Sequence, residues 1–229
     1  MKLSIVVPVY NEERTLEEIV GRVLATPYEK EVLLVDDGSR DRSREIIARL
    51  ADAHPGIVRS FLHAQNGGKG AALQTGFAAV EGDFVVVQDA DLEYDPADYG
   101  TLLAPLQAGE ADVVYGSRFL GRSERVHFRL HTLANRILTG FSNLFTGYRL
   151  TDMETCYKVF PAAVARSLQL RSRAFTIEPE LTAAFARRRL RIVEVPIHYE
   201  NRGYEEGKKI GWRDGVAALW AIVRFRFFP

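Results

Sequence analysis

The sequence has a single cysteine, no long apolar run and no excess of either charge. Cys156 has no second cysteine to bond with, so an intrachain disulfide is excluded and a reducing compartment is the default. No run of about 18 apolar residues occurs, so we expect no membrane-spanning segment, and residues 1–5 lead into an expected strand rather than a signal peptide. Lys and Arg number 30 and so do Asp and Glu, so the net charge gives no indication of nucleic-acid binding.

The two common glycine-rich nucleotide fingerprints are missing as well. Residues 66–70 read Asn-Gly-Gly-Lys-Gly, which lacks the spacing and the final Ser or Thr of a P-loop. No Gly-x-Gly-x-x-Gly follows the first expected strand, at 3–10. A P-loop kinase and a Rossmann dehydrogenase are therefore disfavoured. The glycine segment fits either a flexible turn before a helix or a close backbone approach that brings Lys69 to a ligand.

What the chain does contain is a regular alternation of strands and helices. Segments with helical apolar spacing lie between the expected strands, which cover 3–10, 31–35, 57–63, 84–87, 112–115 and 191–195. This alternation predicts an α/β fold with a mostly parallel central sheet, flanked by helices and joined by right-handed crossovers. In such a sheet ligands bind at the carboxyl ends of the strands, so we look for the site there.

The most informative stretch follows the expected strand at 84–87. Three carboxylates, Asp89, Asp91 and Glu93, come directly after four apolar residues. Burying bare carboxylates is costly, so these acids should lie where the strand leaves the sheet. Two carboxylates two residues apart suit a hard cation such as Mg²⁺ or Mn²⁺, and we expect that cation to hold a diphosphate. A polar strand exit without a ligand fits the same residues. Other expected strands also end in polar residues: Asn11, Glu12, Asp36 and Asp37.

The second half of the chain carries three segments with open interpretations. Residues 126–147 have helical apolar spacing, which fits a core helix or an interfacial helix whose Arg side faces lipid headgroups. The apolar tail at 214–229 is too short to span a bilayer and fits a membrane surface, the core or a dimer contact. The glycine-rich segment at 203–211 fits a solvated loop or a lid over a diphosphate.

Seven motifs, in order along the chain, resemble those of the family 2 glycosyltransferases, and they cover nearly the whole sequence. They lie at 6–12, 35–39, 66–70, 89–91, 116–118, 151–158 and 205–210. The last two make the chain similar to the dolichol-phosphate mannose synthase-like branch. The resemblance implies one catalytic domain over 1–229 with a GT-A, Rossmann-like fold. Residues 1–118 would bind the nucleotide sugar. Residues 119–229 would form an acceptor and interfacial part, with a lid at 202–211 and an amphipathic C-terminal helix.

The activity implied by this resemblance is inverting, metal-dependent transfer of a hexose from GDP-mannose or UDP-glucose to dolichyl or undecaprenyl phosphate. The metal would be Mg²⁺ or Mn²⁺ on Asp89, Asp91 and Glu93, although some relatives carry Gln in place of Glu93. The residues expected to bind the donor are Pro8, Tyr10, Glu12, Val35, Asp37, Lys69, Asp89, Ala90, Asp91, Arg202 and Lys208. The acceptor phosphate would meet Arg118, Arg129 and His131. The residues expected to be catalytic are Asp91, Arg118 and Asp152.

A lipid-phosphate acceptor implies a peripheral protein at the cytoplasmic face of a membrane. Many relatives continue into transmembrane helices where this sequence stops, at Pro229, which gives 126–147 and the tail a larger expected part in lipid contact. A lipid phosphate is already an anion and needs no base, whereas a hydroxyl acceptor needs one, for which Asp152 is the candidate. Two alternatives therefore stay open: a soluble or protein-bound hydroxyl acceptor, and a protein that binds nucleotide sugars without turnover.

Overall fold

A computed structural model describes residues 1–120, 129–172, 176–200 and 212–228. Within these residues, seven strands form one sheet in the order β3-β2-β1-β4-β6-β5-β7. The strands are β1 (Lys2–Val9), β2 (Glu29–Asp36), β3 (Val58–Leu62), β4 (Phe84–Val87), β5 (Val113–Ser117), β6 (Lys158–Pro161) and β7 (Ile192–Pro196). Only β6 runs antiparallel to its neighbours, β4 and β5, and every other pair is parallel. The expected α/β fold with a mostly parallel sheet is confirmed.

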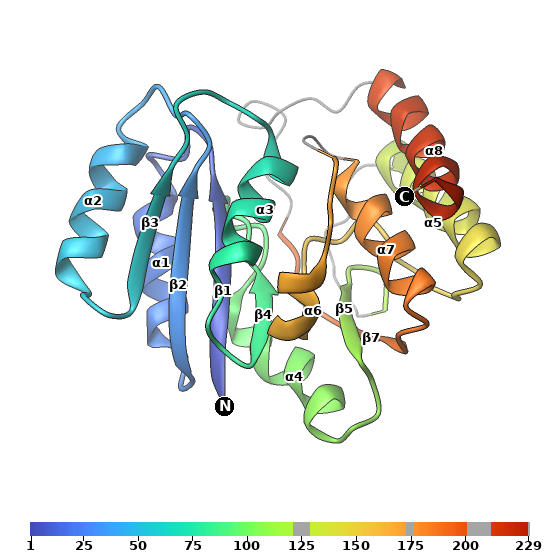
Figure 1. The fold of residues 1–229 in the computed structure, drawn as a ribbon, viewed down its shortest axis with the longest axis horizontal. Helices are drawn as coiled ribbons and strands as arrows, with labels where there is room; N and C mark the ends of the chain where they lie inside the picture. Colours follow the sequence, from blue (N-terminus) through green and yellow to red (C-terminus); the bar gives the residue numbers. More distant parts are fainter. Residues whose placement is uncertain (121–128, 173–175, 201–211, 229) are drawn as a thin grey trace.

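Helices cover both faces of this sheet. They are α1 (Leu16–Ala25), α2 (Ser43–Ala53), α3 (Lys69–Ala79), the short 3₁₀ turn η1 (Pro96–Asp98), α4 (Tyr99–Gln107), α5 (Arg129–Thr146), α6 (Ala162–Ser167), α7 (Ile177–Arg187) and α8 (Trp212–Phe227). In Figure 1, α3 and α7 lie in front of the sheet and α1 behind it, while α5 and α8 lie side by side at one end. Coverage on both faces explains why β1, β2 and β4 are near-continuous apolar runs.

The parallel register brings several polar chain segments to one edge of the sheet. Pro8 pairs with Val35 and Val9 with Asp36, while Val6 pairs with Val87. The residues after β1, β2 and β4 therefore leave the sheet together, at the upper edge in Figure 1. Because β6 runs antiparallel, the residues that precede it reach the same edge. We call this the carboxyl edge.

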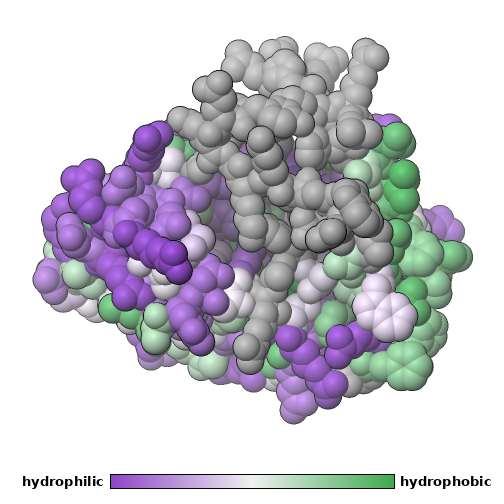
Figure 2. All heavy atoms as spheres, turned by 90° about the horizontal axis from the view of Figure 1, so that it is seen from above, coloured by the Kyte–Doolittle hydropathy of each residue, from purple (hydrophilic) through white to green (hydrophobic). Residues whose placement is uncertain are grey.

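An exposed apolar face covers the outer side of α5 and α8. Its residues are Leu133, Ile137 and Leu144 in α5, Trp220 and Phe227 in α8, and Phe228 just beyond, each more than half exposed. Figure 2 shows apolar surface gathered at this end of the molecule and hydrophilic surface at the opposite end. The other sides of both helices pack inward. The helix α5, which forms the described part of the segment at 126–147, thus contributes both to the core and to the surface. Within the described residues, no helix has the length and apolar character needed to cross a bilayer.

The contact between α3 and β1 depends on Gly76, because a Cβ at this position would overlap Val6 Cγ1. We expect Gly76→Ala to lower the free energy of unfolding by about 1–3 kcal/mol through overpacking. A matched control is Gly21→Ala in α1, where a Cβ meets nothing within 4 Å. That change should leave stability equal or raise it by up to about 1 kcal/mol. Urea unfolding measures both, and equal effects at the two glycines would contradict the packing argument.

Candidate active site

The acidic loop that follows β4 is held in shape by Gln88, a buried residue at the end of the strand. Its Oε1 accepts hydrogen bonds from the hydroxyls of Tyr99 (2.8 Å) and Tyr157 (2.7 Å). Its amide nitrogen donates to the carbonyl oxygens of Asp89 (3.1 Å) and Tyr94 (3.3 Å). One fully bonded side chain thus fixes both ends of the loop, and the two aspartates in it project from a rigid base.

The three acids of this loop have different partners. Asp89 forms an ion pair with Lys69, whose Nζ lies 2.9 Å from Oδ1. Asp91 accepts a hydrogen bond from the backbone amide of Glu93 (3.2 Å). The Glu93 carboxylate in turn accepts from the hydroxyl of Tyr199 (2.9 Å). In the part of the chain that the structure describes, no three His, Cys, Asp or Glu side chains lie close enough together to hold a metal ion.

Asp89 and Asp91 nevertheless fit a divalent cation in its usual mode of binding beside a diphosphate. Both carboxylates are partly exposed at the carboxyl edge. Mg²⁺ is commonly held by one or two protein carboxylates together with substrate phosphates and water, and it does not need a full protein cage. The oxygen donors present therefore match that ion, with the remaining ligands expected from the substrate. Glu93, engaged with Tyr199, was expected as a third ligand, and that role stays a prediction.

The glycine segment is fastened by Asp37, at the end of β2. The two carboxylate oxygens accept from the backbone amides of Gly67 (2.9 Å) and Gly68 (2.6 Å), and Oδ1 also contacts His63 Nδ1 (2.8 Å). Gly68 has a φ of +90°, which favours glycine. The carboxylate of Asp37, expected to bind the donor, is thus used to shape this segment. Of the two interpretations of the segment, the geometry favours the close approach, because α3 starts there and brings Lys69 to Asp89.

A second acid, Glu178 in α7, links Lys69 to a buried lysine of β6. Glu178 Oε1 lies 3.3 Å from Lys69 Nζ, and its Oε2 is bonded to Lys158 Nζ. Lys158 is fully buried and also donates to the backbone carbonyls of Met153 (3.1 Å) and Thr155. This link was not predicted from the sequence. A lysine within the apolar run 156–160 was the available signal, because a buried ammonium needs a counter-charge.

On the other side of the acidic loop, Arg118 and Asp152 form a two-pronged ion pair. Arg118 Nε lies 2.7 Å from Oδ2 and Nη2 lies 2.8 Å from Oδ1. The backbone amide of Arg118 (3.1 Å) and Asn135 Nδ2 (3.1 Å) complete four hydrogen bonds to the carboxylate. Burial favours the neutral form of Asp152, but the guanidinium outweighs it and holds the pKa of Asp152 below its usual value. Asp152 is therefore an ionised partner that orients Arg118, a poor position for a base.

The turn at 151–157, between α5 and β6, lies between these two groups. Glu194 of β7 accepts hydrogen bonds from the turn's first two amides, at 2.7 and 2.9 Å. Farther along, the amide of Cys156 donates to the hydroxyl of Tyr94 (3.1 Å), the last residue of the acidic loop. The turn is thus tied to β7 at one end and to the acidic loop at the other, which gives its side chains a fixed direction.

Glu154, in the middle of this turn, differs from the acids around it. Its Oε1 is buried and is without a hydrogen-bond partner among the described residues. Burial raises the pKa of Glu154 to about 7, the charge of Glu178 adds to the rise, and Lys158 opposes it. Glu154 was not predicted from the sequence, because spacing alone does not show which of two neighbouring acids, Asp152 or Glu154, pairs with the arginine.

The remaining residues expected to bind the donor lie along the same edge. Pro8 and Val35 are paired across β1 and β2, the Val35 side chain is fully buried, and the donor contact of Val35 stays a prediction. Tyr10 is 42% exposed just after β1, Glu12 accepts from Thr15 Oγ1 (2.8 Å), and Ala90 is buried. Four other expected residues cannot be placed in this way. Arg202 and Lys208 of the expected lid (202–211), and the side chains of Arg129 and His131, lie outside the described residues.

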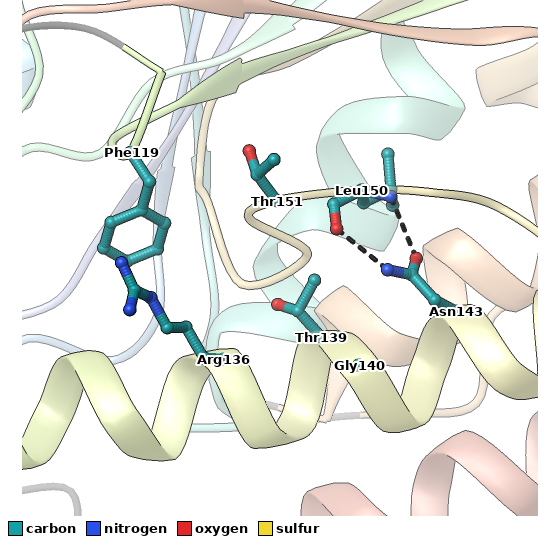
Figure 3. Close-up of a pocket in the computed structure, with 7 residues that line it drawn as sticks. All are labelled: Phe119, Arg136, Thr139, Gly140, Asn143, Leu150 and Thr151. Atoms are coloured by element: carbon teal, nitrogen blue, oxygen red, sulfur yellow. Dashed lines mark hydrogen bonds between the residues drawn. The ribbon is translucent and has the colours of Figure 1, made fainter.

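A pocket of 310 Å³ opens beside the Arg118–Asp152 pair, against α5. Figure 3 shows the Arg136 side chain pointing toward Phe119, across from the turn. Asn143 fixes the far wall by bonding the carbonyl (2.8 Å) and the amide (3.0 Å) of Leu150. Phe119 and Thr151, the chain neighbours of Arg118 and Asp152, line the pocket together with residues of α5. The residues that line it are Phe119, Arg136, Thr139, Gly140, Asn143, Leu150 and Thr151.

The family model described as Glycosyl transferase family 2 matches residues 4–169. The chain is 31% identical over 210 residues to undecaprenyl-phosphate 4-deoxy-4-formamido-L-arabinose transferase of Edwardsiella ictaluri (strain 93-146), covering 90% of this chain and 62% of that relative's length. A wide range of solved structures shares the fold. Glucosyl-3-phosphoglycerate synthase from Mycobacterium tuberculosis, in complex with Mn²⁺, UDP-glucose and phosphoglyceric acid, aligns with a TM-score of 0.73, 23% identity and coverage of 100% of this chain and 80% of that chain. Mannosyl-3-phosphoglycerate synthase from Rubrobacter xylanophilus aligns with a TM-score of 0.70, 19% identity and coverage of 98% and 72%. These neighbours confirm the expected GT-A fold.

The Arg118–Asp152 pair allows a direct energetic test. Asp152→Asn leaves a largely buried guanidinium without its counter-charge, so we expect stability to fall by about 3 kcal/mol. The double variant R118M/D152N should lose less than the sum of the two single changes, with a coupling of about 1–3 kcal/mol. Urea unfolding of all four proteins measures this coupling. The exposed pair Arg191–Asp112 is the matched control and should show much weaker coupling. Equal coupling in the two pairs would contradict the locked geometry.

Proposed function

The chain belongs to glycosyl transferase family 2, and we propose that it transfers a hexose, with inversion, from a nucleotide sugar to a polyprenyl phosphate. The observation that carries the proposal is the guanidinium of Arg118, which lies beside the acidic loop. Arg118 is held in one orientation by a carboxylate that has no remaining capacity to act as a base. An acceptor that is already an anion fits such a site, and the relative named above acts on undecaprenyl phosphate.

The donor would lie along the carboxyl edge, with its nucleotide over the ends of β1 and β2 and its diphosphate at the acidic loop. Asp89 and Asp91 would hold the divalent cation, Mg²⁺ or Mn²⁺, which neutralises the charge that develops on the leaving diphosphate. Burial would lower the pKa of Lys69, but the charge of Asp89 raises it well above its usual value, so the ammonium stays charged beside this position. We propose that the donor is GDP-mannose or UDP-glucose.

The acceptor would approach from the α5 side. Its phosphate would meet Arg118, and the pocket lined by Phe119 and Arg136 would receive the group next to it. A phosphate oxygen attacks the anomeric carbon, the bond to the diphosphate breaks, and no proton has to be removed from the nucleophile. The alternative in which a hydroxyl acceptor is activated by Asp152 is disfavoured, because all four hydrogen bonds to that carboxylate come from the protein.

The exposed apolar face of α5 and α8 would contact the membrane that holds such a lipid. The face adjoins the acceptor pocket through α5, so a prenyl chain leaving the pocket would remain near the bilayer. Exposed arginines of the same helices, Arg136 and Arg224, are placed to meet lipid headgroups. We propose peripheral attachment at the cytoplasmic face, where nucleotide sugars are made. The predicted roles of Arg129, His131, Arg202 and Lys208 remain part of this picture.

A transfer assay tests the reaction. Purified protein, Mn²⁺ and radiolabelled GDP-mannose or UDP-glucose are mixed with undecaprenyl or dolichyl phosphate, and label is followed into the organic phase. Label in the lipid with one donor supports the proposal and identifies the sugar. A donor that binds with metal but labels only a water-soluble acceptor would contradict the lipid phosphate. Binding of the donor without any turnover would favour a protein that binds nucleotide sugars without catalysing their transfer.

The metal role of the acidic loop gives a second prediction. Asp91→Ala should lower transfer by about 100-fold or more, because the charge on the leaving group loses its counter-ion. Calorimetry should show that the variant binds the donor equally with Mn²⁺ and with chelator, while the wild type binds more tightly with Mn²⁺. Asp52→Ala, on the exposed surface of α2, serves as the control and should change neither quantity. Full activity of either protein in chelator would refute the metal role.

The proposed contact between the exposed apolar face and a membrane gives a third prediction. The double variant I137D/L144D should bind about tenfold more weakly to vesicles of phosphatidylethanolamine and phosphatidylglycerol, because two charges replace apolar contacts. Leu62→Asp is a matched control, since Leu62 is 59% exposed on β3 at the opposite end of the sheet. Flotation of the protein with vesicles measures the binding. An equal loss in the control, or no loss in the double variant, would refute this orientation.

A further inference from the structure

Glu154 presents a buried carboxylate oxygen that the described parts of the protein leave without a hydrogen bond. Such groups are rare, because a buried polar atom without a partner loses its contact with water and gains nothing in return. Two acids of the described chain that act on Glu154 both have partners of their own. Asp152 is bonded to Arg118 and Asn135, and Glu178 is paired with two lysines. The missing hydrogen bond therefore has to come from outside the described chain.

The position of Glu154 along the sheet indicates which part of a substrate reaches it. In the order of the strands, the expected nucleotide site lies over β2 and β1, and the acidic loop for the diphosphate follows β4. Arg118, held by Asp152 and expected to meet the acceptor, directly follows β5. Between β4 and β5 stands only β6, and Glu154 lies in the turn that leads into it. The group that passes between diphosphate and acceptor must lie over this turn.

The charges around Glu154 favour a neutral hydrogen-bond donor as its partner. Among the described residues, two acids, Asp152 and Glu178, and two bases, Arg118 and Lys158, act on its charge, and each acid is already paired with a base. The balanced set gives no excess charge to draw in an ion. A sugar hydroxyl is neutral and can donate the one hydrogen bond that Glu154 Oε1 lacks.

We propose that Glu154 accepts a hydrogen bond from a hydroxyl of the transferred sugar and thereby contributes to the choice of donor. This inference rests on the proposed function, since it needs a nucleotide sugar at the acidic loop. Glu154 acts here on the part of the donor that differs between nucleotide sugars, whereas the aspartates of the loop act on the diphosphate that all of them share.

Calorimetry with matched ligands separates these two contributions. The probes are UDP-glucose against UDP and GDP-mannose against GDP, each with Mn²⁺. Glu154→Met keeps the size of the side chain but removes the acceptor oxygen. We expect it to weaken binding of the nucleotide sugar about tenfold or more and binding of the nucleoside diphosphate less than twofold. Glu154→Gln keeps an acceptor oxygen and should recover most of the sugar affinity. The control is Glu110→Ala, because Glu110 is exposed and distant from Glu154 in the sequence. It should change neither the binding of the nucleotide sugar nor that of the nucleoside diphosphate.

The other outcomes would refute either the contact between Glu154 and the sugar or the proposed function. Equal weakening of sugar and diphosphate ligands, or no weakening, would refute the contact between Glu154 and the sugar. Unchanged sugar binding with transfer lost equally in the Met and Gln variants would assign Glu154 as a base for a hydroxyl acceptor. A wild-type protein that binds no nucleotide sugar, but folds and melts normally, would refute the proposed function itself. Thermal melting checks that each variant is folded. If the Met variant does not fold, the Gln variant still shows how sugar and diphosphate binding respond to a change at this carboxylate.

Discussion

The arrangement of the carboxyl edge depends on one buried carboxylate, Glu178, which lies between the ammonium groups of Lys69 and Lys158. Lys69 begins α3 and reaches Asp89, so it belongs to the half of the sheet that faces the expected donor. Lys158 begins β6 and holds the turn that carries Glu154. Without Glu178, two ammonium groups would face each other in the interior, at a cost of several kcal/mol. The pairing thus keeps the acidic loop and the turn at a constant separation.

Much of the fold could be predicted from the sequence because most of the sheet is parallel. Strands buried on both faces need apolar residues at nearly every position, and β1, β2 and β4 show this clearly. The strand β6 escaped notice because it is four residues long and begins with a lysine. Its charge is explained only by Glu178, which lies 20 residues away in the chain. Pairings of this kind depend on the tertiary fold and leave no local pattern.

The candidate site was predictable in its location but less so in its details. Acids at strand ends indicate the edge where a ligand binds, and Asp89 and Asp91 do lie there. Spacing does not show which carboxylates are taken up by the protein itself. Asp37 and Asp152 read as candidates for ligand contact, yet the first holds two glycine amides and the second holds an arginine. Glu154, which the sequence analysis passed over, is the acid that the fold leaves with an open hydrogen-bonding position.

The antiparallel strand β6 also has a consequence for how the chain is made. It pairs with β4 through Val85 and Phe160, and β5 reaches β4 only across it. A ribosome that has just completed β4 leaves one edge of that apolar strand uncovered until residue 161 has emerged. At a synthesis rate of about 5–20 residues per second, this interval lasts about 4–15 s. An apolar strand with an open edge can pair with another chain during that time. The protein is therefore most exposed to aggregation while it is being translated.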